Sequence, residues 1–307
     1  MTYRGKLTLV FTAVLLGTLA GAVACVPVID RVRNAGAEED VLYIPTASAV
    51  KRLSLGYRGL LADIYWTRAV QYFGSRHHAK AMSYKLLYPL LDITTQLDPQ
   101  LTVAYEFGSI FLSQDPPEGA GQPQQAVVLV ERGIRENPSL WRLYYHLGYI
   151  QALELHDYKA AGETFLRGSE IPGAYTWMKV LAANMAQHGG EAETARFLWT
   201  RIHDSAEDPM IKRNAAQHLL ALQVEDDVQK LEEMVQAYRK QAGTAPASLT
   251  SLVAIGWMKR VPVDPLGHPY RLTADGRVYV QDAGELPFLR RGLPPNAKAP
   301  TGPELPF

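Results

Sequence analysis

The chain has 307 residues, and its 31 Lys and Arg balance its 31 Asp and Glu, so the formal net charge at pH 7 is zero. A balanced charge supplies no overall field to attract nucleic acid or acidic substrates, which argues against a nucleic-acid-binding protein. This length allows one extended repeat domain or about two globular domains. The single cysteine excludes an intramolecular disulfide and a cysteine-pair metal site.

The first predicted element is a membrane segment, because residues 7–29 contain no charged side chain. A helix needs about 20 apolar residues to span a bilayer. We therefore interpret residues 1–30 as an uncleaved transmembrane signal anchor. A cleaved or lipidated signal is the alternative, since Cys25 follows the small residue Ala24 at the end of the apolar run. A small apolar residue within a membrane helix is the simpler account of Cys25.

The charges on the two sides of this apolar run favour opposite orientations of the membrane segment. Arg4 and Lys6 favour a cytoplasmic amino terminus, whereas Arg31 and Arg33 favour the reverse. We expect the body of the protein outside the cytoplasm, which in a double-membraned bacterium means the periplasmic side of the inner membrane. Residues 31–55 are expected to form a linker, with residues 41–45 extended and Ser54 as a cap before the first helix.

The pattern of residues 140–168 predicts a helical hairpin. Leu147 and Gly148 lie on the packed face of a first helix, and His156, Asp157 and Tyr158 form the turn. Ala161, Phe165 and Gly168 then supply large and small positions on a second helix, and Pro172 follows it. This spacing resembles one unit of the tetratricopeptide repeat family, although the turn lies one residue later than in the family pattern. A single unit cannot bury its own apolar face, so neighbouring units are expected.

Matching segments flank this unit on both sides. Upstream, residues 101–112 and 124–138 are expected to pair, and downstream, residues 176–202 repeat the plan around Gly189-Gly190. A degenerate hairpin is predicted before them, and a fifth from residues 211–222 and 226–241 after them. The loop at residues 113–125 is rich in Pro and Gly and is expected to be a long exposed turn, either a contact loop or a variable surface. The resemblance implies a mainly α fold, a right-handed solenoid over residues 56–243.

The carboxyl-terminal residues differ in character. Residues 244–284 resemble the tail of the major pseudopilin of type II secretion systems, through Leu249, Leu252, Gly256, Pro262 and the run Asp264-Pro265-Leu266-Gly267-His268-Pro269-Tyr270. Asp264 is expected to accept backbone donors, and Gly267 to adopt positive φ. Residues 270–273 and 277–281 are predicted strands of a small β-hairpin that caps the solenoid, with partner docking as the alternative. Residues 285–307 are expected to be irregular.

No catalytic, cofactor or metal motif is recognisable in the sequence, so we expect neither an enzyme nor a small-molecule substrate. Adjacent His77 and His78 lack further ligands for a metal ion. An acidic run is interpreted as the solvated start of a helix; it comprises Glu225, Asp226, Asp227, Glu232 and Glu233.

A groove for a protein or peptide partner is what the repeat resemblance implies. In that family the first helices line it, and the matching positions here include Tyr105, Arg142, Tyr145, Tyr149 and Lys179, together with Thr102, Ser109, Thr176 and Ala183. The alternative is that Tyr145 and Tyr149 only pack between hairpins.

From the predicted anchor, repeats and pseudopilin-like tail we expect a membrane-anchored scaffold or adaptor of the cell envelope, in pilus or secretion assembly. An adaptor for polysaccharide export or protein quality control, or an enzyme with an unrecognised site, are the alternatives.

Overall fold

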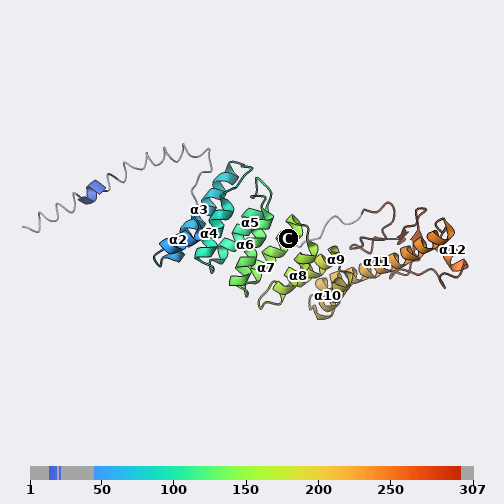
Figure 1. Cartoon of the computed structure of the whole chain (residues 1–307). Helices are drawn as coiled ribbons and strands as arrows, with labels where there is room; N and C mark the ends of the chain where they lie inside the picture. The colour runs from blue at the N-terminus through green and yellow to red at the C-terminus, as the bar shows by residue number, and fades with distance from the viewer. Residues whose placement is uncertain (1–13, 19–20, 22–44, 299–307) are drawn as a thin grey trace, which may run out of the picture. The chain divides into compact units, whose positions relative to one another are not determined.

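The computed structural model describes residues 14–18, 21 and 45–298, and this part of the chain is mainly helical (Figure 1). Most of the predicted transmembrane segment, residues 7–29, and the predicted extended residues 41–44 lie outside the described residues. Within the described part, no helix is both long enough and apolar enough to cross a bilayer. The chain divides into two compact units, Met1–Ala104 with Asp115–Gly121, and Tyr105–Gln114 with Gln122–Phe307.

The first unit contains α2 (Ala47–Leu53), α3 (Arg58–His78) and α4 (Leu87–Leu97), and both α2 and α3 pack on α4. The predicted role of Ser54 is wrong, because it ends α2 instead of starting the next helix. Its hydroxyl donates to the Lys51 carbonyl at 2.8 Å, while Thr46 accepts from the Ala49 amide at the start of α2. The predicted linker therefore contains a docked helix.

The Pro-rich loop is more enclosed than predicted. Residues 115–121 belong to the first unit, where the Tyr84 hydroxyl donates to the Pro117 carbonyl at 2.6 Å and Ala120 is buried. The His77 ring nitrogen Nδ1 also lies 3.0 Å from that carbonyl oxygen. These contacts fold part of the loop against the end of α3 and the segment that follows it. The prediction of an exposed turn holds only for part of the loop, including Gln114, Asp115, Glu118 and Gly121.

The second unit is built from helices that pack on their neighbours in sequence. They are α5 (Thr102–Ser113), which enters the unit at Tyr105, α6 (Pro123–Glu136), α7 (Trp141–Tyr149), α8 (Tyr158–Ser169), α9 (Met178–His188), α10 (Ala192–Ser205) and α11 (Pro209–Ala242). Each helix from α6 to α10 packs on the one that follows it. The hairpins predicted at residues 140–168 and 176–202 correspond to α7 with α8 and α9 with α10.

Glycines on these helices receive large side chains from their neighbours. A Cβ atom on Gly148 would lie 2.6 Å from the Phe165 ring, and one on Gly168 would lie 2.6 Å from the Cβ of Tyr144. Such distances are far below van der Waals contact, so α7 and α8 approach as closely as they do only because these positions lack side chains. The expected close approach at Gly148 is confirmed.

The late turn of this hairpin has a structural counterpart. Between α7 and the turn, Ile150–Glu154 form a π-helix, and the Leu155 amide donates to the Ile150 carbonyl at 3.1 Å. A π-helix accommodates one extra residue without breaking the helix. The packed faces on either side therefore keep their register although the chain is one residue longer. Asp157 then accepts from the Ala160 amide at 3.0 Å and caps α8.

The predicted fifth hairpin is wrong, because its two segments form the single 34-residue helix α11. No Gly or Pro interrupts the chain between Met210 and Ala242, so nothing forces a turn. The acidic run is consequently in mid-helix and not at a helix start. Gly243, with φ of 80°, ends α11 in the left-handed conformation.

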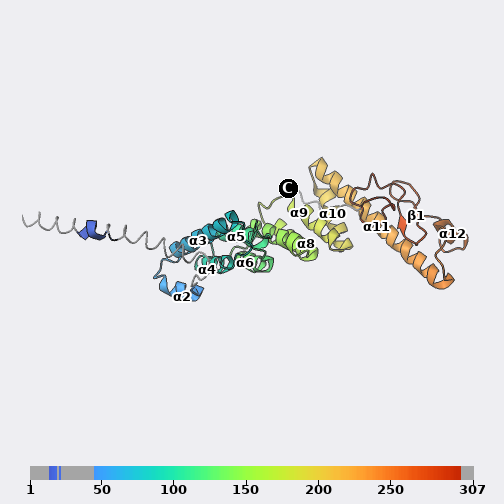
Figure 2. The same ribbon diagram turned by 90° about the horizontal axis from the view of Figure 1, so that it is seen from above.

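The carboxyl-terminal module packs along the second half of α11 (Figure 2). Its helix α12 (Leu249–Ala254) begins in a capping box of Ser248 and Ser251, and its strands β1 (Arg271–Leu272) and β2 (Val278–Tyr279) pair antiparallel. As predicted, Asp264 accepts from the Leu266 and His268 amides, both at 2.9 Å, and Gly267 has φ of 91°. The observed strands are shorter than the predicted ones.

The acidic run of α11 binds this module instead of facing water. Asp227 accepts from the Tyr270 hydroxyl at 3.1 Å, Glu232 accepts from the Val278 amide at 3.1 Å, and Glu225 accepts from the Arg290 amide at 2.9 Å. Burial raises the pKa of Glu225, and the Arg290 and Arg291 amides oppose that rise. These three carboxylates therefore accept hydrogen bonds from backbone and side-chain donors of the module, whereas Asp226 pairs with Arg196 of α10.

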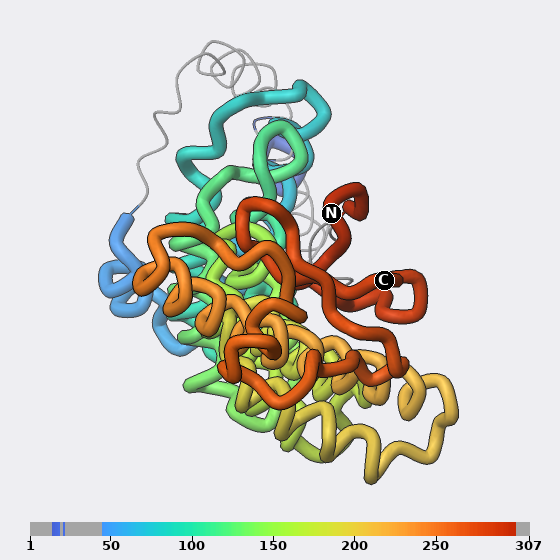
Figure 3. The backbone as a smooth tube through the Cα atoms, turned by 90° about the vertical axis from the view of Figure 1, so that its right-hand side faces the viewer, coloured from blue at the N-terminus to red at the C-terminus, as the bar shows by residue number. Residues whose placement is uncertain are grey.

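Residues 285–293 lack regular structure, as predicted, but they are firmly packed. Leu286 and Leu289 are buried in the core with α11, and Figure 3 shows this red segment beside the helix. The Phe288 ring stacks on His218, which stacks in turn on Trp199, with ring centroids 3.7 and 3.9 Å apart. His218 Nδ1 lies 2.8 Å from the side-chain oxygen of Gln187, so this nitrogen donates. The chain beyond α12 contacts α9 through Arg290, whose guanidinium donates to the Gln187 carbonyl at 3.3 Å, and it is linked to α10 through the His218 ring.

The close approach of α7 and α8 predicts opposite effects for two Gly→Ala substitutions. Gly148→Ala forces the Phe165 ring to move and should destabilise this hairpin by about 1–3 kcal/mol. Gly74→Ala, in α3, has nothing within 4 Å of the new Cβ and should stabilise its helix by about 0.5–1 kcal/mol. Hydrogen exchange of the helix amides measures both effects. Equal protection in the two variants would show that Gly148 does not set the helix separation.

The buried His218 predicts acid sensitivity. Burial, with a smaller contribution from His188, lowers the His218 pKa from 6.5 to about 3. Below about pH 6.5 the His218 ring binds a proton in the unfolded chain but not in the folded chain. The part of the free energy of unfolding that depends on a neutral His218 is therefore complete above that pH. It then falls by about 1.4 kcal/mol per pH unit towards pH 3. The His218→Phe variant keeps an aromatic ring and should show a flatter decline of its thermal midpoint between pH 6.5 and 4. An identical decline in both proteins would exclude His218 as the cause.

Candidate functional site

The predicted groove on the first helices of the hairpins is largely filled by packing. Tyr105 on α5 is fully buried, and a Cβ atom on Gly133 of α6 would lie 2.8 Å from its ring. The Tyr105 side chain therefore fills the space that this glycine leaves. Its assignment to a partner-binding surface is wrong, because a side chain without exposed surface cannot contact a partner.

Arg142 on α7 already has a charged neighbour. Its Nε atom lies 3.1 Å from Oε2 of Glu106 on α5, and its guanidinium lies over the Trp141 ring, 5.9 Å from the centroid. The arginine side chain is half exposed, so the ion pair contributes little to stability. It does hold the guanidinium against the protein, and Arg142 is less available to an incoming carboxylate than the sequence suggested.

Tyr145 and Tyr149 belong to an aromatic cluster. The Tyr145 hydroxyl donates to that of Tyr149 at 3.2 Å, and their ring centroids are 4.6 Å apart. Both rings pack against the Phe165 ring, with centroid distances of 6.3 Å from Tyr145 and 5.6 Å from Tyr149. Trp141 and Tyr175 extend the cluster through contacts with Tyr145. Burial, and then the hydrogen bond with Tyr145, raises the pKa of the Tyr149 hydroxyl. These contacts favour the packing interpretation for both tyrosines over the groove interpretation.

Lys179 differs from the other predicted residues. It is exposed at the start of α9 and forms no ion pair with another residue of the described chain. Its side chain lines a cavity of about 430 Å³ between the ends of α8 and α10. The other lining residues are Leu166, Ser169, Glu170, Leu198, Arg201, Ile202 and Ser205.

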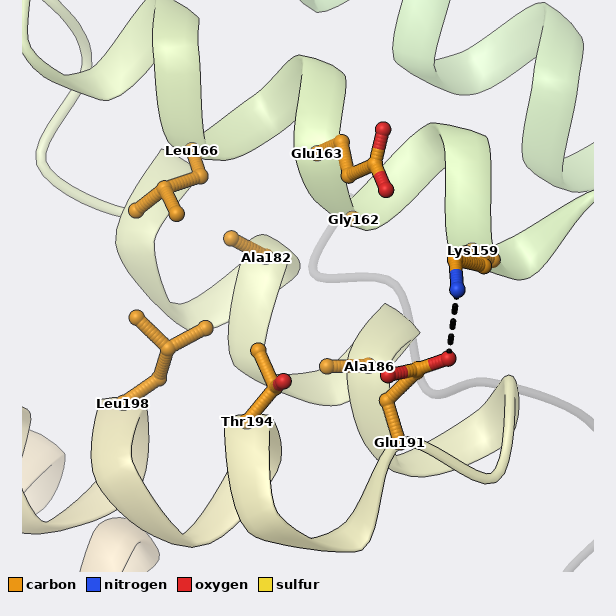
Figure 4. Close-up of a pocket in the computed structure, with 9 residues that line it drawn as sticks. All are labelled: Lys159, Gly162, Glu163, Leu166, Ala182, Ala186, Glu191, Thr194 and Leu198. Carbon is orange, nitrogen blue, oxygen red and sulfur yellow. Dashed lines mark hydrogen bonds and ion pairs between the residues drawn. The ribbon is translucent and has the colours of Figure 1, made fainter.

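A second hollow of about 110 Å³ continues from this cavity along α9 (Figure 4). The two share Leu166 of α8 and Leu198 of α10, so together they form one surface depression, which we call the α8–α10 groove. Ala182 and Ala186 of α9 form its floor. Figure 4 shows the Lys159 amine bonded to the Glu191 carboxylate at the other end of the groove, 2.8 Å apart.

Small side chains make this groove possible. A Cβ atom on Gly162 would lie 3.3 Å from the Ala186 amide nitrogen, so α8 and α9 lie close together there. The helix α9 is consequently sunk between α8 and α10, and its alanines leave space above them. The groove has apolar sides, Lys179 and Arg201 at one end, and Glu163 and Thr194 near the other. An apolar depression with a few polar groups at its ends is the general form of a ligand or peptide site.

Sequence reasoning missed the α8–α10 groove because the family resemblance directed attention to the first helices. Its walls come from second helices, and its floor comes from alanines that a pattern assigns to the core. The spacing of Ala182 and Ala186, four residues apart on one helix face, was the available signal.

Within the described residues, no group of three or more His, Cys, Asp or Glu is arranged to hold a metal ion. Comparison with known families and curated proteins finds no matching family model and no matching curated sequence. The groove geometry therefore carries the functional argument for this chain.

The packing of the aromatic cluster leads to a test with two truncations. Tyr149→Ala removes a ring that contacts Phe165 and Tyr145 and should lower the free energy of unfolding by about 3 kcal/mol. Lys179→Ala removes an exposed side chain and should change it by less than about 0.5 kcal/mol. Urea unfolding followed by tryptophan fluorescence provides the comparison. A neutral Tyr149→Ala variant would mean that the tyrosine is free to serve a partner.

Proposed function

We propose that this protein is a membrane-anchored scaffold of tetratricopeptide type, with a right-handed helical solenoid that binds a segment of a partner protein. The α8–α10 groove is the observation that carries this proposal. It has apolar walls at Leu166 and Leu198, and it lies between helices that already pack on both sides, so a bound segment would need no rearrangement of the core. A preformed site of this kind loses little conformational entropy on binding.

The chemistry of the groove indicates the type of segment. Leu166 and Leu198 offer apolar surface to one or two aliphatic or aromatic side chains. At one end Lys179 and Arg201 outnumber the single carboxylate Glu170, and this excess of positive charge favours a carboxylate, from an acidic side chain or a chain terminus. An amphipathic helix or an extended peptide with an apolar anchor and an acidic end satisfies both requirements.

The carboxyl-terminal module has a supporting role in this proposal. By covering the second half of α11 it would cap the solenoid, since an uncapped array exposes an apolar face. Its β-hairpin and Asp-Pro turn resemble the tail of the major pseudopilin, which supports a place in the assembly of a pilus or secretion machine. The anchor in residues 1–30 would keep the groove near the membrane where such machines are built.

Site-specific photocrosslinking tests the groove in the cell. Benzoylphenylalanine at Thr194, which lines the groove, should give one discrete crosslinked species, because a bound segment would pass over this side chain. The same residue at Thr200, exposed on another face of α10, is the matched control and should give none. Adding Leu166→Glu should abolish the adduct by placing a charge in the apolar wall.

The proposal fails if both positions crosslink equally or if the Leu166→Glu substitution leaves the adduct intact. Circular dichroism of the purified variants must show unchanged helix content, so that loss of crosslinking reports on the groove and not on unfolding.

A further inference from the structure

A cluster of exposed apolar side chains marks the turn between α2 and α3 in the first unit. Leu55 is 87% exposed, Leu53 76%, Tyr57 69% and Leu60 59%, and Ile64 follows one turn later on α3 at 44%. Single exposed apolar residues are ordinary, but adjacent ones rarely occur without a function. We call these five residues the α2–α3 corner.

The backbone holds the tip of the corner outward. Leu55 has φ of 47° and Gly56 has φ of 95°, so two successive residues adopt the left-handed region. This conformation is unfavourable for leucine and persists only when surrounding contacts impose it. The Tyr57 amide donates to the Ser54 carbonyl at 2.8 Å and closes the turn. The strained leucine gains no burial within the described chain, which indicates that its exposure serves an external contact.

Basic side chains surround the corner. Lys51, Arg52 and Arg58 line a surface hollow together with Ser48, Ser54, Leu55 and Gly56. None of the three forms an ion pair with a described residue, and Asp63 is the first acidic residue after Pro45. Between Pro45 and Asp63 the only charged side chains are these three cations, and an apolar tip beside them suits the interface of a bilayer that contains anionic lipid, where leucine and tyrosine enter and cations meet phosphate.

The corner is a fixed part of the first unit. Ala47 and Val50 on the opposite face of α2 are buried, and α2 packs on α4. Insertion of the tip would therefore orient the whole unit and not only a loose peptide. A chain extends at most about 3.6 Å per residue, so residues 30–46 can place α2 no more than roughly 60 Å from the predicted membrane segment.

We propose that the α2–α3 corner is a membrane-contact surface, which inserts Leu55 and its neighbours into the headgroup region of an anionic bilayer. This contact goes beyond the scaffold role, because it lies outside the α8–α10 groove and needs no partner protein. Its source of affinity is dual, as burial of apolar side chains and attraction of three cations act together. It would fix the orientation of the first unit on the membrane to which the chain is anchored.

Depth-dependent fluorescence quenching tests the contact in the full-length chain. A Cys25→Ala background removes the native cysteine, and Leu55→Cys carries a nitrobenzoxadiazole label in lipid nanodiscs. Doxyl-labelled lipid is present in all nanodiscs as the quencher. Quenching at position 55 should be severalfold greater in nanodiscs that contain phosphatidylglycerol than in nanodiscs whose unlabelled lipid is phosphatidylcholine alone. The matched control is Met82→Cys, 72% exposed in the same unit, and its label should remain unquenched.

Charge reversal separates the two sources of affinity. The combination Lys51→Glu, Arg52→Glu and Arg58→Glu should reduce quenching at position 55 to its level in phosphatidylcholine, with helix content unchanged by circular dichroism. The inference would be overturned if quenching at position 55 equals that at position 82. It would also be overturned if quenching at position 55 changes neither with lipid charge nor with the three charge-reversing substitutions. Shielding of the label only after addition of another protein would also overturn it and would identify a protein contact. Because Thr194 crosslinking is measured separately, failure here leaves the groove proposal standing.

Discussion

The continuous helix α11 connects two hydrophobic cores, and both depend on its unbroken backbone hydrogen bonding. Ala215 and Leu222 in its first half pack into the core of α8, α9 and α10, while Val228, Leu231 and Val235 in its second half hold the carboxyl-terminal module. A turn near Leu222 would separate these cores and remove the scaffold from the module. The rigid helix instead transmits the geometry of one core to the other over about 50 Å.

The polar groups along α11 complement this apolar packing. Carboxylates of the acidic run accept hydrogen bonds from module residues far along the chain, so charged groups secure irregular backbone that cannot satisfy itself through long strands. The stack of Trp199, His218 and Phe288 extends the same attachment to α10. The module is thus held by apolar contacts along one face of α11 and by directional bonds at its edges.

The two proposed functional surfaces arise from opposite uses of side-chain size. In the α8–α10 groove, Gly162 and the alanines of α9 remove volume and leave a depression. At the α2–α3 corner, a strained turn places apolar side chains where they are largely exposed. The α8–α10 groove can receive a segment of a partner protein, whereas the α2–α3 corner can insert into a bilayer. Under these two proposals, the first unit sets the orientation of the protein at the membrane and the second unit binds its ligand.

Much of the helical order was accessible from residue patterns, since periodic apolar faces and small-large pairs such as Gly148 with Phe165 depend on local spacing. The Asp264 turn was also predictable, because its donors lie within four residues. The continuity of α11 was also open to prediction, because no Gly or Pro interrupts it. The burial of Tyr105 and the acceptor role of Glu225 were decided only by tertiary structure. These features depend on which distant segment occupies each face: a carboxylate facing water and one facing Arg290 have the same local sequence.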